Sequence, residues 1–126
     1  MELQSKQAVS TKQRGDAAEA AALAHLARAG LRLVARNYRT PGRGGGEVDL
    51  ILQDTDGTLV FAEVRQRASA RFGGAAASVG ATKRRRIVFA ARHFLMRLPA
   101  TPACRFDVVA IEGTRVEWLK AAFDAA

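Results

Sequence analysis

The fold is decided by two stretches, Gly46-Glu-Val-Asp-Leu-Ile-Leu52 and Leu59-Val-Phe-Ala-Glu-Val-Arg-Gln-Arg67, which read as two β-strands joined by a short polar turn. Carboxylates at Glu47, Asp49 and Glu63 interrupt runs that are otherwise rich in Val, Ile, Leu and Phe. Burying a charge in such surroundings is costly unless another group neutralises it. This conflict between local rules is typical of a functional site, so the hairpin is predicted to carry one.

The length of the hairpin loop determines which residues face each other, because a shift of one residue inverts every side chain. With the loop Thr55-Asp56-Gly57, Asp54 pairs with Thr58 and Asp49 stands directly opposite Glu63. A shorter loop would separate these two carboxylates. The longer loop is favoured, because Gly57 then occupies the left-handed position of a three-residue loop with a G1 bulge.

The same register divides the hairpin into a polar and an apolar face. It sets Glu47 opposite Arg65 and keeps Arg67 on the polar face. The apolar face is predicted to comprise Val48, Leu50, Leu52, Val60, Ala62 and Val64.

Two carboxylates directly opposite each other on a sheet repel unless a cation lies between them. A divalent metal ion would remove the repulsion between Asp49 and Glu63, and their oxygen ligands suit Mg²⁺ or Mn²⁺. The alternative is a ladder of ion pairs on an exposed face, in which Arg65 and Arg67 neutralise Glu47 and Glu63.

The composition favours a polyanionic partner. The chain has 126 residues and carries 20 Lys and Arg against 12 Asp and Glu, a formal net charge of +8. Nucleic acid is the first candidate for such a charge, although small basic proteins without a specific partner are common. Sixteen of the 20 cations are Arg, so an Arg at any single position is also explained by the overall Arg-rich composition, without a role in binding.

The remaining composition excludes several classes. Cys104 is the single cysteine and His25 and His93 are the two histidines, so neither an internal disulfide nor a zinc ligand set is expected. The chain has no apolar leader and no run of about 18 apolar residues. A cytoplasmic protein without a membrane span is therefore predicted.

Residues 1–13 are predicted to form a flexible tail and residues 14–126 a single domain. Beyond the hairpin, the pattern predicts a helix from Asp16 to Gly30, a strand over 31–39 at or near a sheet edge, a mobile loop over 40–46, a loop over 68–80, a helix from Thr82 to about Leu98, a strand over 104–111 and a short strand over 114–119. Glu19 lies three residues after Asp16 and fits a capping box, a role compatible with one in a site.

Four successive cations begin the second predicted helix, where the helix dipole disfavours positive charge. These are Lys83, Arg84, Arg85 and Arg86, and Arg39, Arg43, Arg67 and Arg71 lie in flanking segments. Binding a phosphate backbone would explain their placement, and the alternative is a solvated charge run. Because aromatic residues are few, recognition of backbone and shape is expected rather than of bases.

The spacing of Asp49 from Glu63-Val64-Arg65 resembles the D…E-x-K core of the restriction-endonuclease-like (PD-(D/E)XK) nucleases. More closely, residues 15 to about 124 resemble the YraN-like family, an uncharacterised bacterial group similar in fold to archaeal Holliday-junction resolvases. The matching stretches are Gly15-x-x-x-Glu19, Arg36-Asn37-Tyr38-Arg39, Gly46-Glu47-Val48-Asp49-Leu50-Ile51, Phe61-Ala62-Glu63-Val64-Arg65-Gln66-Arg67, Lys83 with its Arg run, Arg105-Phe106-Asp107-Val108-Val109 and Ala122-Phe123.

This resemblance implies an α/β fold with a restriction-endonuclease-like αβββαβ core, a mixed central sheet flanked by helices and a short C-terminal strand. It implies that Asp49 and Glu63 ligate Mg²⁺ or Mn²⁺, that the Val64 carbonyl is a further ligand and that Glu19 approaches the same site. DNA would be the partner, and a homodimer is expected by analogy.

The chain departs from the family pattern where Arg65 replaces the motif lysine. Arg cannot deprotonate and so cannot act as a general base, although its guanidinium can still clamp a phosphate. Two functions therefore stay open. One is a metal-dependent, structure-selective endonuclease of weak activity, and the other is a nucleic-acid-binding module that has lost turnover.

Overall fold

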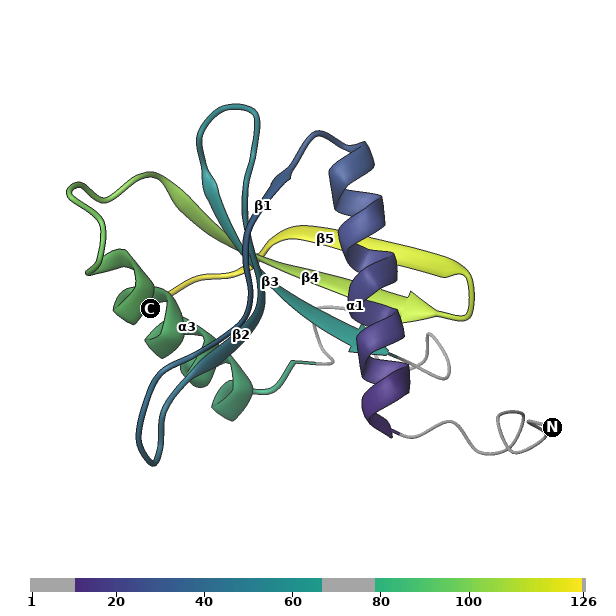
Figure 1. Cartoon of the computed structure of the whole chain (residues 1–126), viewed down its shortest axis with the longest axis horizontal. Helices are drawn as coiled ribbons and strands as arrows, with labels where there is room; N and C mark the ends of the chain where they lie inside the picture. Colours follow the sequence, from purple (N-terminus) through teal and green to yellow (C-terminus); the bar gives the residue numbers. More distant parts are fainter. Residues whose placement is uncertain (1–10, 67–78, 126) are drawn as a thin grey trace, which may run out of the picture.

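The computed structural model describes residues 11–66 and 79–125, which form two helices and a five-stranded sheet (Figure 1). The elements are α1 (Thr11–Arg28), β1 (Arg32–Arg39), β2 (Glu47–Gln53), β3 (Leu59–Gln66), α3 (Ala81–Leu95), β4 (Cys104–Glu112) and β5 (Arg115–Phe123). The strands lie in the order β1-β2-β3-β4-β5; β3 and β4 are parallel and the other neighbours antiparallel. The predicted α/β class with a mixed sheet flanked by helices is confirmed, and β1 is an edge strand as predicted.

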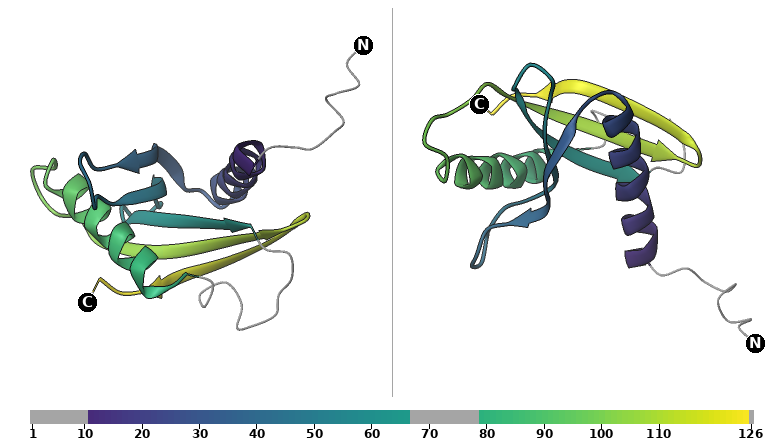
Figure 2. Two further views of the ribbon diagram at one scale, coloured as in Figure 1. Left: turned by 90° about the horizontal axis from the view of Figure 1, so that it is seen from below. Right: turned by 45° about the horizontal axis from the view of Figure 1, so that its top comes forward.

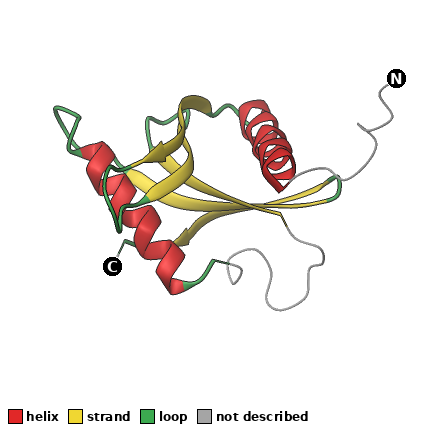
Figure 3. Cartoon of the chain, turned by 60° about the horizontal axis from the view of Figure 1, so that its bottom comes forward, coloured by secondary structure: helices red, strands yellow, loops and turns green. Residues whose placement is uncertain are grey.

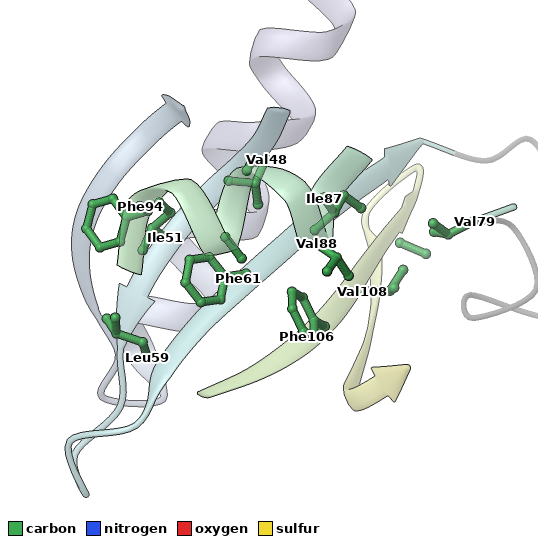
Figure 4. Packing of buried hydrophobic residues seen from close by; sticks show 13 residues of the cluster. Val48, Ile51, Leu59, Phe61, Val79, Ile87, Val88, Phe94, Phe106 and Val108 are labelled. Atoms are coloured by element: carbon green, nitrogen blue, oxygen red, sulfur yellow. The ribbon is translucent and has the colours of Figure 1, made fainter. Parts of the chain in front are cut away.

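The two helices lie on opposite faces of the sheet (Figures 2 and 3). Alternate residues of the central strands therefore feed two separate cores. Leu50 and Val60 pack on the side of α1, whereas Ile51 and Phe61 pack under α3 (Figure 4). Within the described ranges, neither helix is long and apolar enough to cross a membrane.

The predicted hairpin register is confirmed. Leu50 pairs with Ala62, the Asp54 amide donates to the Thr58 carbonyl over 2.9 Å, and Gly57 has a φ of 92°. The loop is thus the three-residue form, with glycine in the left-handed conformation that its geometry requires.

One predicted face assignment is wrong. Val48 packs with Ile51 in the core under α3 instead of joining Leu50 on the other face (Figure 4). The reason is that the β2–β3 ladder ends at Leu50 and Ala62, and β2 then leaves β3 toward α3. Gly46 sits against the helix backbone, where a Cβ atom would lie 2.2 Å from the Arg86 carbonyl oxygen.

The loop over 40–46 is confirmed, but its ends are hydrogen-bonded together. The Thr40 amide donates to the Gly46 carbonyl oxygen over 3.0 Å, and the Gly46 amide donates to the Thr40 hydroxyl over 2.7 Å. The two ends of the loop are therefore held together, and β2 begins where Gly46 contacts α3.

The start of α1 differs from the prediction. The helix begins at Thr11, so residues 11–13 are helical, whereas residues 1–10 lie outside the described part of the chain. Asp16 is inside the helix and forms an ion pair with Lys12 at 3.0 Å, the i,i+4 spacing that supports a helix. Glu19 is consequently in the third turn and not in a capping box.

The last two elements also differ in length. Helix α3 ends at Leu95, before the predicted Leu98. Strand β5 is not short: it extends to Phe123, whose ring stacks on Phe106 with centroids 5.1 Å apart. The pairing of β4 with β5 shifts register between Phe106 and Val108. At this shift the Ala121 amide donates to the buried Asp107 carboxylate over 3.0 Å, so β5 stays attached to β4 as far as Phe123.

Candidate functional site

Asp49 and Glu63 lie just beyond the last residue pair of the β2–β3 ladder. The Val64 amide, which the departing strand no longer satisfies, donates instead to Asp49 Oδ2 over 2.8 Å. This side-chain bond continues the hairpin by one step and fixes the Asp49 carboxylate beside β3. The structure thus brings together the two carboxylates that the register predicted to face each other.

The Glu63 carboxylate is buried, with only 3% of the residue exposed. Its Oε1 atom has no hydrogen-bond partner among the described residues. Burial first, and then repulsion by Asp49, raises the pKa of Glu63 to about 8, although Lys83 and Arg65 act in the opposite direction. Two carboxyl groups held this close together favour a shared proton or a bound cation between them.

Lys83 brings an ammonium group into this site from the first turn of α3. Its Nζ atom lies 3.7 Å from Glu63 Oε2 and 3.2 Å from Glu47 Oε2, and its side chain is 24% exposed. Arg65 Nη1 lies 3.7 Å from the same Glu63 oxygen, but the Arg65 side chain is 40% exposed. Lys83 is therefore the more enclosed of the two cations at Glu63.

Glu47 does not face Arg65, which corrects the prediction from the extended register. Because β2 turns toward α3, Glu47 forms ion pairs with Lys83 and with Arg86, the latter at 3.5 Å. Burial opposes the charge of Glu47, but Lys83, Arg39 and Arg86 outweigh it and hold the pKa of Glu47 below its usual value. The exposed ion-pair ladder is wrong at Glu63, because that carboxylate is buried.

Glu19 lies on α1, which packs on the other face of the sheet, and the charge of Asp49 acts on it. Its Oε1 atom lies 3.5 Å from Arg36 Nη2 and is buried without a hydrogen bond. Burial, followed by repulsion from Asp49, raises the pKa of Glu19, although the neighbouring Arg36 and Asn37 act in the opposite direction. Asn37 adopts a φ of 50°, which Asn tolerates better than most residues.

Glu19 nevertheless does not complete a ligand cage. Among the described residues, no three His, Cys, Asp or Glu side chains are grouped closely enough to hold a metal ion together. The residues available for one are the Asp49 and Glu63 carboxylates and the main-chain carbonyl of Val64. Oxygen ligands with remaining positions left to water or phosphate fit Mg²⁺ or Mn²⁺.

The basic run at the start of α3 is divided between two sides of the helix, and its binding of phosphate stays a prediction. Lys83 and Arg86 turn to Glu47, whereas the Arg84 guanidinium lies over the Phe123 ring at 5.1 Å and Arg85 donates to the Thr82 hydroxyl. Arg39 and Arg43 are exposed near the carboxylates in sequence. Arg67 and Arg71 lie outside the described residues.

A second buried charge cluster was not predicted as a unit. The fully buried Asp107 carboxylate accepts hydrogen bonds from Arg105 Nε, Trp118 Nε1 and the Ala121 amide, and Arg105 Nη1 reaches Asp54 at 2.9 Å. The alternation of Arg105 and Asp107 on one strand face is the sequence signal for it. Because its carboxylates are hydrogen-bonded, this cluster fastens β4 to the hairpin and to β5.

A family model described as "Uncharacterised protein family UPF0102" matches residues 18–111. The chain belongs to this family. The match includes Glu19, Asp49, Glu63 and Lys83, and it is the YraN-like group that the motifs resemble.

The relatives of this UPF0102 chain include a UPF0102 protein of Paracidovorax citrulli, 70% identical over 115 residues, which are 91% of this chain and 85% of the relative. Another, from Albidiferax ferrireducens, is 67% identical over 91% of this chain and 90% of its own length. A third, from Methylibium petroleiphilum, is 61% identical over 94% of this chain and 99% of its own length.

Proposed function

We propose that this UPF0102 protein is a restriction-endonuclease-like, metal-dependent nuclease that cleaves phosphodiester bonds in branched or single-stranded DNA. The observation that carries the proposal is the buried Glu63 carboxylate, which lies beside Asp49 with one oxygen unsatisfied. Two adjacent carboxyl groups repel each other when both are ionised, and a divalent cation bound between them would remove that repulsion.

Asp49, Glu63 and the Val64 carbonyl would hold Mg²⁺ or Mn²⁺. Such an ion supplies Lewis-acid polarisation of the scissile phosphate. The Val64 amide contributes by orienting the Asp49 carboxylate, since it donates a hydrogen bond to Oδ2.

Lys83 supplies the ammonium group that position 65 of the motif lacks. The lysine of the motif normally follows the hairpin glutamate in sequence, whereas here Lys83 reaches the same glutamate from α3. In this position it orients a phosphate or an attacking water, and the more exposed Arg65 clamps a phosphate oxygen. The net charge of +8, with Arg39 and Arg43 on neighbouring segments, draws DNA to the site. A homodimer would present two such sites to a symmetric junction.

A non-catalytic nucleic-acid-binding module is the second candidate. It is favoured by Arg65 and by the two carboxylates that hold Lys83, Glu47 at 3.2 Å and Glu63 at 3.7 Å. In this case the carboxylates and cations form a structural ion-pair network, and the protein binds DNA without turnover.

Nicking of a labelled four-way junction distinguishes the two candidates. We expect the protein to nick the junction in Mg²⁺ or Mn²⁺, and Asp49→Asn to abolish nicking while the junction is still bound. Asp16→Asn, which removes an exposed carboxylate on α1, should leave nicking unchanged. Absence of nicking on junction, flap, single-stranded and duplex DNA, by wild type and by Arg65→Lys, would overturn the nuclease proposal.

Isothermal titration with Mg²⁺ and Mn²⁺ tests the metal site without relying on activity. Wild type should bind one of these ions, and Asp49→Asn and Glu63→Gln should each weaken binding by at least about tenfold, because each removes a charged ligand. Binding that survives both substitutions would place the metal elsewhere.

A further inference from the structure

A groove runs along α3 on the side that faces the C-terminal end of β5. It consists of two adjoining hollows of about 910 and 390 Å³, which share Val88, Arg92, Phe123, Asp124 and Ala125. None of the carboxylates of the candidate metal site lines it. The groove is thus a separate concave surface, on the opposite side of α3 from Lys83 and Arg86.

The groove has aromatic rings on its floor and on its edge. Phe123 is held between Phe106, stacked 5.1 Å away, and the Arg84 guanidinium, which lies 5.1 Å above the ring. Phe89, by contrast, is 52% exposed. The core under α3 does not need this side chain, so its exposed ring is available to a flat ligand.

The edge of the groove is positively charged. Arg85 and Arg92 flank Phe89 at helical spacings of four and three residues, so the three side chains share one face of α3. Neither Arg85 nor Arg92 forms an ion pair within the described ranges, although both lie in a groove that also contains Asp124. Two helical turns separate them, about 10.5 Å along the axis.

We propose that this groove binds single-stranded nucleic acid, with phosphates on Arg85 and Arg92 and an unpaired base on Phe89. A ring between two cations is the arrangement that a strand requires, because every nucleotide offers a phosphate charge and a flat base. Duplex DNA does not fit this description, since its bases are stacked inside the helix. An acidic peptide would satisfy the cations but carries no regular succession of flat groups for Phe89.

The proposal goes beyond the metal site and does not depend on it. Strand binding in the groove needs neither Asp49 nor a metal ion, so it would hold equally for a nuclease and for a module without turnover. If the nuclease proposal is correct as well, the groove would hold an unpaired strand while the carboxylates act on the other side of α3.

Fluorescence anisotropy with a labelled oligothymidine of roughly 12 nucleotides, in EDTA, tests the proposal. Phe89→Ala should weaken binding about fivefold or more, the loss expected for one stacked base, and Phe89→Tyr should retain it. Met96→Ala is the matched control, because Met96 is a large exposed apolar residue of the same region that does not line the groove.

The salt dependence separates specific phosphate contacts from general charge. Arg85→Ala and Arg92→Ala should each reduce the slope of log affinity against log salt by about 0.7, the value for one phosphate contact on a single strand. Arg115→Ala removes the same charge from the exposed end of β5 and should leave the slope unchanged.

Three results would each overturn the proposal. The first is a Phe89→Ala protein that binds the oligonucleotide as tightly as Met96→Ala does. The second is equal loss from Arg85→Ala, Arg92→Ala and Arg115→Ala, which would show attraction by net charge alone. The third is displacement of the oligonucleotide by a Glu-rich peptide at lower concentration than by unlabelled oligothymidine, which would identify an acidic protein partner. Circular dichroism melting curves should show that all these surface variants remain folded.

Discussion

At Lys83, a single ammonium group lies between carboxylates that come from two different strands. Glu47 belongs to β2 and Glu63 to β3, and Lys83 approaches both because Gly46 allows β2 to touch α3. The nuclease motif that the sequence resembles has a lysine two positions after its glutamate, whereas Lys83 reaches Glu63 from 20 positions further along the chain. An ammonium group thus lies at Glu63 although Arg65 occupies the position two residues after it.

Lys83→Gln should lower the rate of junction nicking by about 100-fold or more, because it removes a preorganised positive charge from the reacting phosphate. Metal binding, measured by isothermal titration, should persist, since both carboxylates remain. Arg86→Gln is the control: Arg86 pairs with Glu47 but forms no ion pair with Glu63. Equal loss of nicking in the two variants would reduce Lys83 to a member of the ion-pair network.

At the scale of single elements, two glycines test where α1 begins and how closely β2 packs against α3. Gly15 lies inside α1 with open space around it, whereas Gly46 lies against the backbone of α3. The same substitution should therefore have opposite effects at the two positions.

Gly15→Ala should stabilise the protein by up to about 1 kcal/mol, because alanine loses less backbone entropy than glycine in a helix interior. The measurement is the free energy of unfolding from urea titration followed by circular dichroism. A helix that began only at Asp16 would leave Gly15 outside it, and the substitution would then bring no gain.

Gly46→Ala should destabilise the protein by about 1–3 kcal/mol or more in the same urea titration, since the added Cβ atom would lie 2.2 Å from the Arg86 carbonyl oxygen and the two backbones must separate. The separation should also withdraw Glu47 from Lys83. Unchanged stability would mean that β2 and α3 are not in close contact at Gly46.

The elements that local chemistry determines were predictable from the sequence. The hairpin loop follows from Gly57, and with it the register that brings Asp49 to Glu63. The side on which Val48 packs was not predictable, because it depends on where β2 leaves β3, and contact with α3 decides that. The predicted start of α1 is too late, because Gly15 and Asp16 resemble a helix boundary in the sequence. In the structure Asp16 instead pairs with Lys12, one turn earlier in the same helix.

At the scale of the whole molecule, α3 separates two surfaces of different chemistry. Lys83 and Arg86 turn to the carboxylates on one side, and Arg85 and Arg92 line the groove on the other. The sequence shows a single cationic run. Only the packing of the helix against β2 and β5 reveals that the side chains of this run lie on two different surfaces. A basic run on a helix therefore indicates the sign of a partner's charge but not the number of binding surfaces.

The cluster of Arg105, Asp54 and Asp107 joins parts of the sheet that are distant in sequence, and it makes the stability of the whole fold dependent on pH. The Thr55 amide first, and then Arg105, stabilise the Asp54 carboxylate and hold its pKa below the usual value. A carboxyl group with a lowered pKa stabilises the fold above its unfolded pKa, and this contribution is lost as the pH falls through the folded pKa.

Wild type should consequently be more stable than Asp54→Asn at neutral pH, and the difference should shrink as the pH falls below about 4. Thermal unfolding of both proteins across this range measures it, with Asp124→Asn as a control for the loss of one carboxylate outside the cluster. A difference that stays constant at every pH would assign the effect of Asp54 to packing. Convergence of the two stabilities at low pH would instead show that the ionised form of Asp54 stabilises the fold. Asp54 pairs with Arg105, which also pairs with Asp107, so this interaction holds the hairpin loop to β4. It thereby keeps the hairpin that carries Asp49 and Glu63 in its place in the sheet.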